Sequence, residues 1–114
     1  MTTRLQWWAE ANRAIGSVPL VVYVPTRDQV DIQSRYADIA GGFPIANFVQ
    51  TRLQLICSVV GCQFYDLTLP FIDAEKSGIQ LYFKDDPHWN SNGVHHAATL
   101  IADYIKENVI GKIK

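Results

Sequence analysis

The pattern of hydrophobic and polar positions predicts a helix at the start of the chain. Leu5, Trp8, Ala11 and Ile15 recur at intervals of three and four residues, the spacing of one helical face. Gly16 follows at the position where a glycine commonly ends a helix. The first expected element is therefore a helix that buries this face and stops just before Gly16.

Two segments have the character of short strands. Val18–Val24 is apolar at nearly every position and rich in β-branched residues, which predicts a strand covered on both faces. Cys62–Leu67 predicts a second, shorter strand that Pro70 ends. Helices are expected between and after these strands, so the two strands should pair in parallel.

Three further helices are expected. Thr26 can cap a helix that runs to Gly41–Gly42. A longer helix is predicted to end at Gly61 and to bury the face formed by Ile45, Phe48, Val49, Leu53, Ile56 and Val60. The last helix is predicted from Asn92 to Asn108, with Ser91 as a capping candidate and a buried side formed by Val94, Ala97, Ala98, Ile101 and Ile105. Residues 73–78 read as a loop or single turn, and residues 79–83 as a brief extended piece.

These elements predict one α/β domain over residues 1–114, with a three-layer, flavodoxin-like arrangement of a parallel sheet and flanking helices. Only two strands are well supported, whereas sheets usually hold about five or six. We therefore expect an incomplete sheet. Its free edge is expected to pair with another copy of the chain or with a missing N-terminal half.

Composition and charge narrow the classes of function. Apolar residues make up 48% of the 114 residues and charged residues 18%, which excludes an intrinsically disordered chain. Ten basic and eleven acidic residues give a net charge of −1, so no nucleic-acid partner is predicted. No apolar signal region follows Met1, and the compartment stays open.

The cysteines and two of the histidines indicate no metal site or cofactor. Cys57 and Cys62 are expected to be thiols near a helix end and a strand start; a disulfide between them would need an oxidising compartment. Two cysteines do not make a zinc site. His95 and His96 are expected to be solvated on the flank of the last helix.

The segment from Leu81 to Gly93 carries the chemistry. His88 follows the carboxylates Asp85 and Asp86 by three and two residues, in a loop broken by Pro87. A carboxylate that accepts a hydrogen bond from one imidazole nitrogen fixes the tautomer and leaves the other nitrogen as a general base. The alternative is that the carboxylates only form a turn.

This segment resembles the C-terminal block of the SGNH (GDSL-type) hydrolase superfamily, in which Asp-x-x-His or Asp-x-His supplies two members of a Ser-His-Asp triad. The resemblance rests on Asp-Pro-His-Trp-Asn-x-x-Gly at residues 86–93. The Pro-Thr-x-x-Gln turn at residues 25–29 after an apolar strand is also similar to SGNH proteins and to alginate O-acetyltransferase relatives. The resemblance implies that His88 is the catalytic base and that either Asp86 or Asp85 orients its ring.

The chain also departs from the family pattern. It contains no Gly-Asp-Ser nucleophile block, and the Gly and Gly-x-Asn-Asp blocks that supply oxyanion donors are absent as well. None of the five serines has a nucleophile-like context: Ser17, Ser34, Ser58, Ser77 and Ser91.

The resemblance therefore implies the C-terminal portion of a serine esterase or O-acyltransferase that is inactive alone. Its parent protein would act on a small acyl ester or an acetylated sugar, by hydrolysis or by transfer. The alternative is a non-catalytic binding or assembly module in which the Asp-Pro-His loop is structural.

Overall fold

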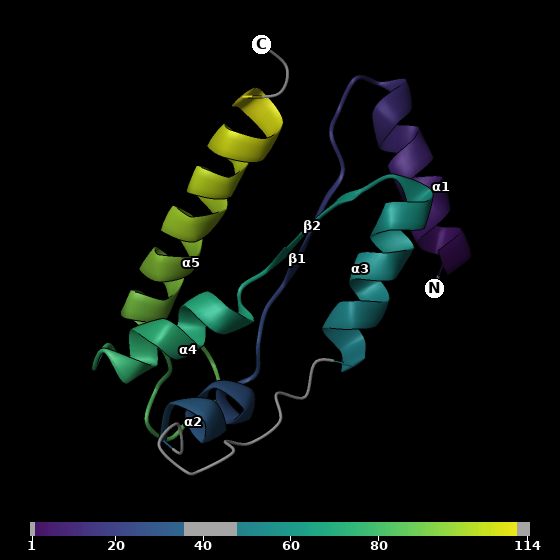
Figure 1. The fold of residues 1–114 in the computed structure, drawn as a ribbon. Helices are drawn as coiled ribbons and strands as arrows, with labels where there is room; N and C mark the ends of the chain where they lie inside the picture. Colours follow the sequence, from purple (N-terminus) through teal and green to yellow (C-terminus); the bar gives the residue numbers. More distant parts are fainter. Residues whose placement is uncertain (1, 36–47, 112–114) are drawn as a thin grey trace. The chain divides into compact units, whose positions relative to one another are not determined.

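The computed structural model describes residues 2–35 and 48–111, which form two compact units. The first unit combines residues 1–23 with 47–66, and the second combines residues 24–46 with 67–114. The first contains α1 (Thr2–Ala14), β1 (Leu20–Tyr23), α3 (Phe48–Val60) and β2 (Gln63–Asp66) (Figure 1). The second contains α2 (Arg27–Arg35), α4 (Thr68–Lys76), α5 (Ser91–Ile105) and the π-helical turn η1 (Lys106–Ile110).

The sheet of the first unit is a parallel pair. β1 and β2 run side by side, from Leu20 opposite Gln63 to Tyr23 opposite Asp66. This pairing, with helices before and between the strands, confirms an α/β chain with a small, incomplete parallel sheet. Every residue of both strands is only half buried, so the expectation of a first strand covered on both faces is wrong for the described residues. In the part of the chain that the structure describes, each strand therefore has a neighbouring strand on one edge only.

A small apolar cluster joins α1 to α3 in the first unit. Ala9, Ile56 and Val60 are buried, and Leu5 and Trp8 pack against them. The prediction for Leu5, Trp8, Ile56 and Val60 is confirmed.

Other residues of the two predicted faces lie outside this cluster. Ile15 is 78% exposed because α1 ends at Ala14 and Gly16 turns the chain with a φ of +80°. Ala11, Phe48 and Val49 are exposed too, since one packing partner covers only a narrow stripe of each helix. Ile45 lies outside the described residues.

Gly61 ends α3, as predicted. Its φ of +85° is a left-handed conformation that favours glycine, and it lets the Cys62 N–H donate to the Cys57 carbonyl at 3.0 Å. The Arg13 guanidinium from α1 donates to the carbonyls of Val60 and Gly61, at 2.9 Å each. The end of α3 is therefore satisfied by both backbone and side-chain donors.

The second unit is built around Phe71 in α4. This ring is fully buried and lies edge-on to Tyr82, with ring centroids 6.2 Å apart. It also packs against Trp89 and His96, at centroid distances of 5.6 Å each. Helix α4 thus packs against the segment of residues 81–93 that carries the candidate chemistry. Helix α2 packs against α4.

Helix α4 corrects two expectations about residues 67–78. Pro70 does not stop the chain's regular structure, and residues 73–78 are not simply a loop, because α4 extends from Thr68 to Lys76. Proline is tolerated in the first turn of a helix, where its missing N–H would have no helical partner. Thr68, Phe71, Ile72 and Ala74 then lie on the buried side.

The cap of α2 confirms the role expected of Thr26. Its hydroxyl accepts a hydrogen bond from the Gln29 N–H at 3.2 Å, and the Gln29 side chain accepts one from the Thr26 N–H at 2.9 Å. The predicted end of this helix at Gly41–Gly42 lies outside the described residues.

Helix α5 differs from the prediction at its cap and on its faces. Asn90 caps it in place of Ser91, and the helical turns continue as η1 to Ile110. Ala97 is buried and Ile101 and Ile105 are half buried, but Val94 and Ala98 are exposed. The buried stripe is displaced toward His96, whose ring packs on Phe71 and is not solvated as expected. His95 is exposed.

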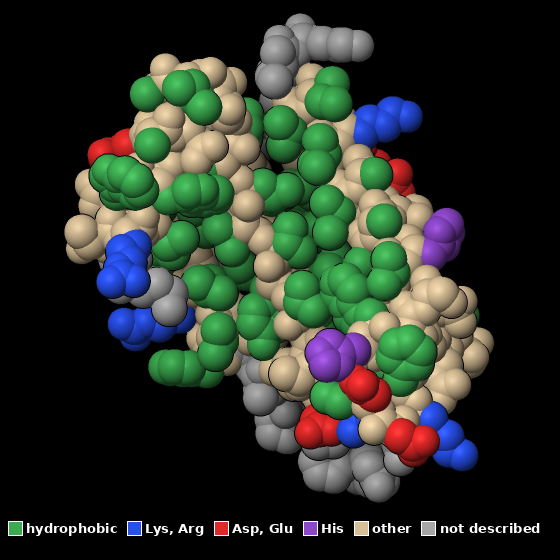
Figure 2. All heavy atoms as spheres, turned by 180° about the vertical axis from the view of Figure 1, so that it is seen from behind, with side chains coloured by type: hydrophobic (Ala, Val, Ile, Leu, Met, Phe, Trp, Pro, Cys, Tyr) green, Lys and Arg blue, Asp and Glu red, His purple; other side chains and the backbone are tan. Residues whose placement is uncertain are grey.

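Hydrophobic side chains are also common on the surface. Many of them are visible in green on the face shown in Figure 2. In the first unit, the large exposed residues are Trp7, Ile15, Val18, Phe48, Val49, Leu55 and Val59. Among the described helices, none is both long enough and apolar enough to span a bilayer.

Candidate active site

The loop that carries His88 is closed at its base by backbone pairing. Tyr82 and Trp89 form an antiparallel bridge, and the Phe83 N–H donates to the His88 carbonyl at 3.1 Å. The Asn90 N–H donates to the Leu81 carbonyl at 3.0 Å. Residues 79–83, expected to be extended, thus form only this single bridge. The pairing holds the ends of the loop together and presents its middle, with the carboxylates and His88, to solvent.

Asp86, not Asp85, accepts the hydrogen bonds of His88. One oxygen, Oδ1, accepts from the His88 backbone N–H at 2.8 Å and also from the ring Nδ1. The backbone bond and then the ring bond hold the pKa of Asp86 below its ordinary value of 3.8, and the positive charge of Arg27 acts in the same direction. With Nδ1 engaged, Nε2 is the ring nitrogen left for proton transfer.

Both members of this pair lie at the surface. The His88 side chain is 83% exposed and that of Asp86 is 53% exposed. A general base must reach its reacting group, so exposure of the imidazole suits a site that a further element would cover.

Asn90 and Gly93 explain the Asn-x-x-Gly part of the motif. The Asn90 side chain accepts from the Gly93 N–H at 2.9 Å, which caps α5. Its amide group donates to the carbonyls of Gln80 at 2.8 Å and Tyr82 at 3.2 Å. A Cβ at Gly93 would lie 2.2 Å from the Leu81 carbonyl oxygen, so only glycine allows α5 to approach this segment.

A mostly apolar groove of about 480 Å³ lies beside His88. Its lining consists of Val24, Pro25, Tyr82, Pro87, His88 and Trp89. Val24 and Pro25 immediately follow β1, and Tyr82 holds them in place because its hydroxyl donates to the Pro25 carbonyl at 2.8 Å. Segments far apart in the sequence therefore meet at His88.

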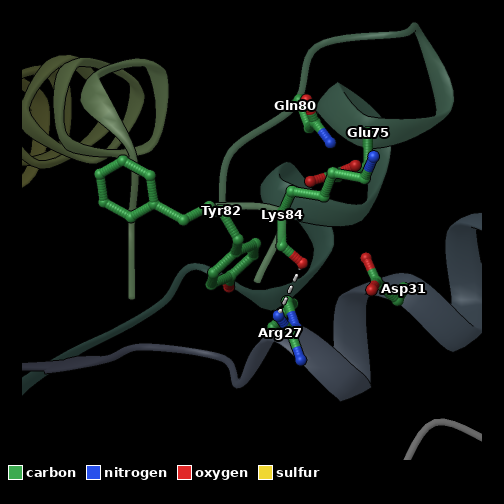
Figure 3. Close-up of a pocket in the computed structure, with 7 residues that line it drawn as sticks. Arg27, Asp31, Glu75, Gln80, Tyr82 and Lys84 are labelled. Carbon is green, nitrogen blue, oxygen red and sulfur yellow. Dashed lines mark hydrogen bonds between the residues drawn. The ribbon is translucent and has the colours of Figure 1, made fainter. Parts of the chain in front are cut away.

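A second, polar cavity of about 420 Å³ also uses Tyr82 as a wall. Figure 3 shows charged and amide side chains from α2, α4 and residues 80–84 around it. The sequence alone does not indicate this site, because its residues are spread over three segments. The one available signal was Arg27, inside the Pro-Thr-x-x-Gln turn.

The serines and the remaining histidines add no third member to the pair. Among the serines whose side chains the structure describes within residues 2–35 and 48–111, none is hydrogen-bonded to His88; the hydroxyls of Ser58 and Ser77 donate to carbonyls of their own helical turns. The same residues contain no group of three or more His, Cys, Asp or Glu side chains that could hold a metal ion.

Comparison with known proteins places the chain in a family. Residues 2–113 match the family described as "SGNH hydrolase-like domain, acetyltransferase AlgX". The chain belongs to this family. Its membership confirms the resemblance to SGNH proteins and to alginate O-acetyltransferase relatives.

A similar curated protein is the alginate biosynthesis protein AlgX of Azotobacter vinelandii. It is 31% identical over 102 residues, which cover 86% of this chain and 20% of the relative. The chain therefore spans about a fifth of the length of the relative it matches. No solved structure matches the chain.

Proposed function

We propose that the chain supplies the Asp-His part of a Ser-His-Asp triad to a parent protein that transfers acyl groups between oxygen atoms. The observation that carries this proposal is the hydrogen bonding of Asp86 Oδ1 to both the backbone N–H and the Nδ1 of His88. Asp86 orients the imidazole, and His88 acts as the base through Nε2. Membership of an SGNH-like acetyltransferase family supports transfer over hydrolysis.

The nucleophile in this proposal is a serine from a part of the parent protein outside residues 1–114. His88 Nε2 takes the proton of the serine hydroxyl as its oxygen attacks the acyl carbonyl carbon. The bond to the donor's oxygen breaks, and that oxygen leaves with the proton from Nε2. A hydroxyl of the acceptor then gives its proton to Nε2 as its oxygen attacks the acyl carbon. The bond to the serine oxygen breaks and that oxygen takes the proton from Nε2, which restores both residues; water in place of the acceptor gives hydrolysis.

The apolar groove beside His88 suits the acyl group. Its walls offer rings and aliphatic carbons from Val24, Pro25, Tyr82, Pro87 and Trp89, and the imidazole lies among them. A small acyl group such as acetyl needs little more than an apolar surface and an oriented carbonyl. A sugar hydroxyl is the expected acceptor, since the relative is named for the biosynthesis of a polysaccharide.

The 114-residue chain by itself is expected to have no esterase activity. Loss of a triad nucleophile typically lowers the rate by about 10⁶-fold, and the family's oxyanion-donor blocks are absent from this sequence too. Turnover of p-nitrophenyl acetate by the purified chain that disappears in His88→Ala would show that a nucleophile lies within these residues.

The decisive experiment uses the parent protein. Its sequence on both sides of residues 1–114 is first searched for the nucleophilic serine. His88→Ala should lower turnover of p-nitrophenyl acetate about 10³-fold or more, whereas His95→Ala, at an exposed histidine of α5, should leave it unchanged. Asp86→Asn should lower turnover strongly and Asp85→Asn should not. Full activity in His88→Ala would overturn the proposal, and the reverse order of the two aspartates would assign the orienting role to Asp85.

One observation favours a non-catalytic alternative. The Asp86 oxygen that accepts the His88 backbone N–H also closes a local turn, which is a structural role in itself. In that case the chain is a binding or assembly module, and the outer edge of its two-stranded sheet pairs with a second copy or with another part of the parent protein. Measurement of mass in solution by light scattering tests the pairing: a monomer that remains soluble at high concentration would argue against it.

A further inference from the structure

The two cysteines of the first unit lie on either side of the turn that ends α3. The Cys62 N–H donates to the Cys57 carbonyl at 3.0 Å, and the Gly61 N–H donates to the same oxygen at 2.8 Å. Gly61 has the left-handed φ of +85° that such a turn requires. In this kind of helix end, the residue after the glycine folds back so that its side chain contacts the residue five positions earlier. Both of those residues are cysteines here.

The backbone bond limits the distance between the two cysteines. The 3.0 Å from the Cys62 nitrogen to the Cys57 oxygen, with covalent bonds of about 1.2–1.5 Å on either side, leaves the two Cα atoms within about 7 Å of each other. Disulfides join Cα atoms that lie roughly 4.4–6.8 Å apart. The side chains interact as well: burial, then a hydrogen bond between the two thiols and the charge of Cys62, raises the pKa of Cys57 to about 12. A bond between the two sulfur atoms is therefore within reach of side-chain rotation.

Contacts with other elements hold this turn in place. The Arg13 guanidinium of α1 donates to two carbonyls of the turn, at 2.9 Å each. β2 begins directly after the turn (Figure 1), and the N–H of its first residue, Gln63, donates to the Pro19 carbonyl at 2.9 Å. Cys62 also packs against the apolar cluster that joins α1 to α3. The folded first unit thus keeps the two cysteines together, and a covalent link between them would join α3 to β2 beside this cluster.

We propose that Cys57 and Cys62 are a redox-active pair that closes to a disulfide in the folded chain and stabilises the junction between α3 and β2. The oxidant is a small disulfide such as oxidised glutathione. Cys62 is the thiol that it reaches first, because Cys62 is half buried and Cys57 is buried.

The reaction is a pair of thiol–disulfide exchanges. The Cys62 thiolate attacks one sulfur of oxidised glutathione, the glutathione S–S bond breaks, and one glutathione leaves as a thiolate. The Cys57 sulfur then attacks the Cys62 sulfur, the second glutathione leaves, and the proton of Cys57 passes to it. The two cysteines have then lost two electrons and two protons, and one oxidised glutathione has become two reduced molecules.

Equilibration of the 114-residue chain with mixtures of oxidised and reduced glutathione tests the proposal. Samples are alkylated under denaturing conditions, and mass spectrometry of the digested chain identifies free thiols, glutathione adducts and the internal link. The parent chain should form the internal link and retain no glutathione adduct. Cys57→Ser should accumulate a glutathione adduct at Cys62, whereas Cys62→Ser, the matched control, should leave the buried Cys57 as a thiol.

Thermal unfolding of the parent chain before and after oxidation measures whether the link fits the fold. The oxidised chain should melt about 5–10 °C higher, because the link restricts residues 57–62 in the unfolded chain. Dithiothreitol should reverse the gain, and neither serine variant should gain stability from the oxidant. Both forms have the same sequence, so the comparison does not depend on whether a variant folds.

Three results would overturn the proposal. They are two thiols that survive an excess of oxidised glutathione, a lasting glutathione adduct on the parent chain, and an oxidised chain that melts no higher than the reduced one. None of these measurements involves acyl transfer, so their outcome is separate from that of the His88→Ala test.

Discussion

The hydroxyl of Tyr82 donates a buried hydrogen bond of 2.8 Å to the carbonyl oxygen of Pro25, 57 residues earlier in the sequence. This bond joins the turn after β1 to the segment that leads into the His88 loop. The ring that it positions separates the apolar groove from the polar cavity and packs on Phe71. One side chain thus connects the two motifs by which the sequence resembles its family.

Tyr82→Phe is expected to destabilise the fold by about 1–2 kcal/mol. The ring remains, but the buried Pro25 carbonyl loses its donor. Urea denaturation followed by tryptophan fluorescence measures the change in the free energy of unfolding. A Tyr82→Phe variant as stable as the parent chain would contradict the structural role of this bond.

The stability of the chain should depend on Asp86 in acid. The pKa of this carboxyl is lower in the folded chain than its ordinary value of 3.8, first because of the His88 backbone bond and then because of the ring bond. A carboxyl with a lowered folded-state pKa stabilises the fold above its unfolded pKa, and this contribution is lost as the pH falls through the folded value.

Comparison of the parent chain with Asp86→Asn measures this contribution. The difference in their free energies of unfolding should be constant above about pH 5 and shrink in stronger acid. The NMR titration of the Asp86 carboxyl should give a midpoint below its ordinary value of 3.8. A midpoint at or above the ordinary value would be inconsistent with the two hydrogen bonds to His88.

Gly93→Ala should be severely destabilising, by about 3 kcal/mol or more. Its Cβ would lie 2.2 Å from the Leu81 carbonyl oxygen, which is backbone and cannot move aside without separating α5 from this segment. The Asn90 bonds to Gln80 and Tyr82 would be lost with it. Thermal unfolding by circular dichroism measures the effect, with the exposed Ser91→Ala as control. Equal melting temperatures for the two variants would refute the close approach.

Cys57 and Cys62 should differ strongly in their reactivity. Burial, followed by the hydrogen bond and charge of the Cys62 thiol, raises the pKa of Cys57 to about 12, so it is protonated at neutral pH. Cys62 is half buried, and neither cysteine is in a disulfide. Iodoacetamide at pH 8 should therefore modify Cys62 first and reach Cys57 only in urea. Mass spectrometry of the digested chain measures both rates, and comparable rates in the folded chain would show that Cys57 is accessible.

Local sequence was sufficient for features whose energetics are local. The cap at Thr26 needs only Gln29 three residues later, and the helix end at Gly61 needs only a residue that tolerates a positive φ. The pair of Asp86 and His88 also forms within one turn of chain, and the sequence had left Asp85 equally possible. The loop geometry selects Asp86, because its oxygen also reaches the His88 backbone N–H.

Other features depend on contacts between residues that are distant in the sequence, and only the tertiary structure decided these. Phe71 needed a helical backbone at Pro70 to reach Tyr82, Trp89 and His96, so local turn signals gave the wrong structure for residues 73–78. The same contact half-buries His96, which helical periodicity alone had placed in solvent. The sequence by itself thus determined the α/β class, the parallel pair of strands and the residues of the His88 loop. The groove and the polar cavity arose only where residues 24–31, 75 and 80–89 meet, because a cavity is made by surfaces that no single segment contains.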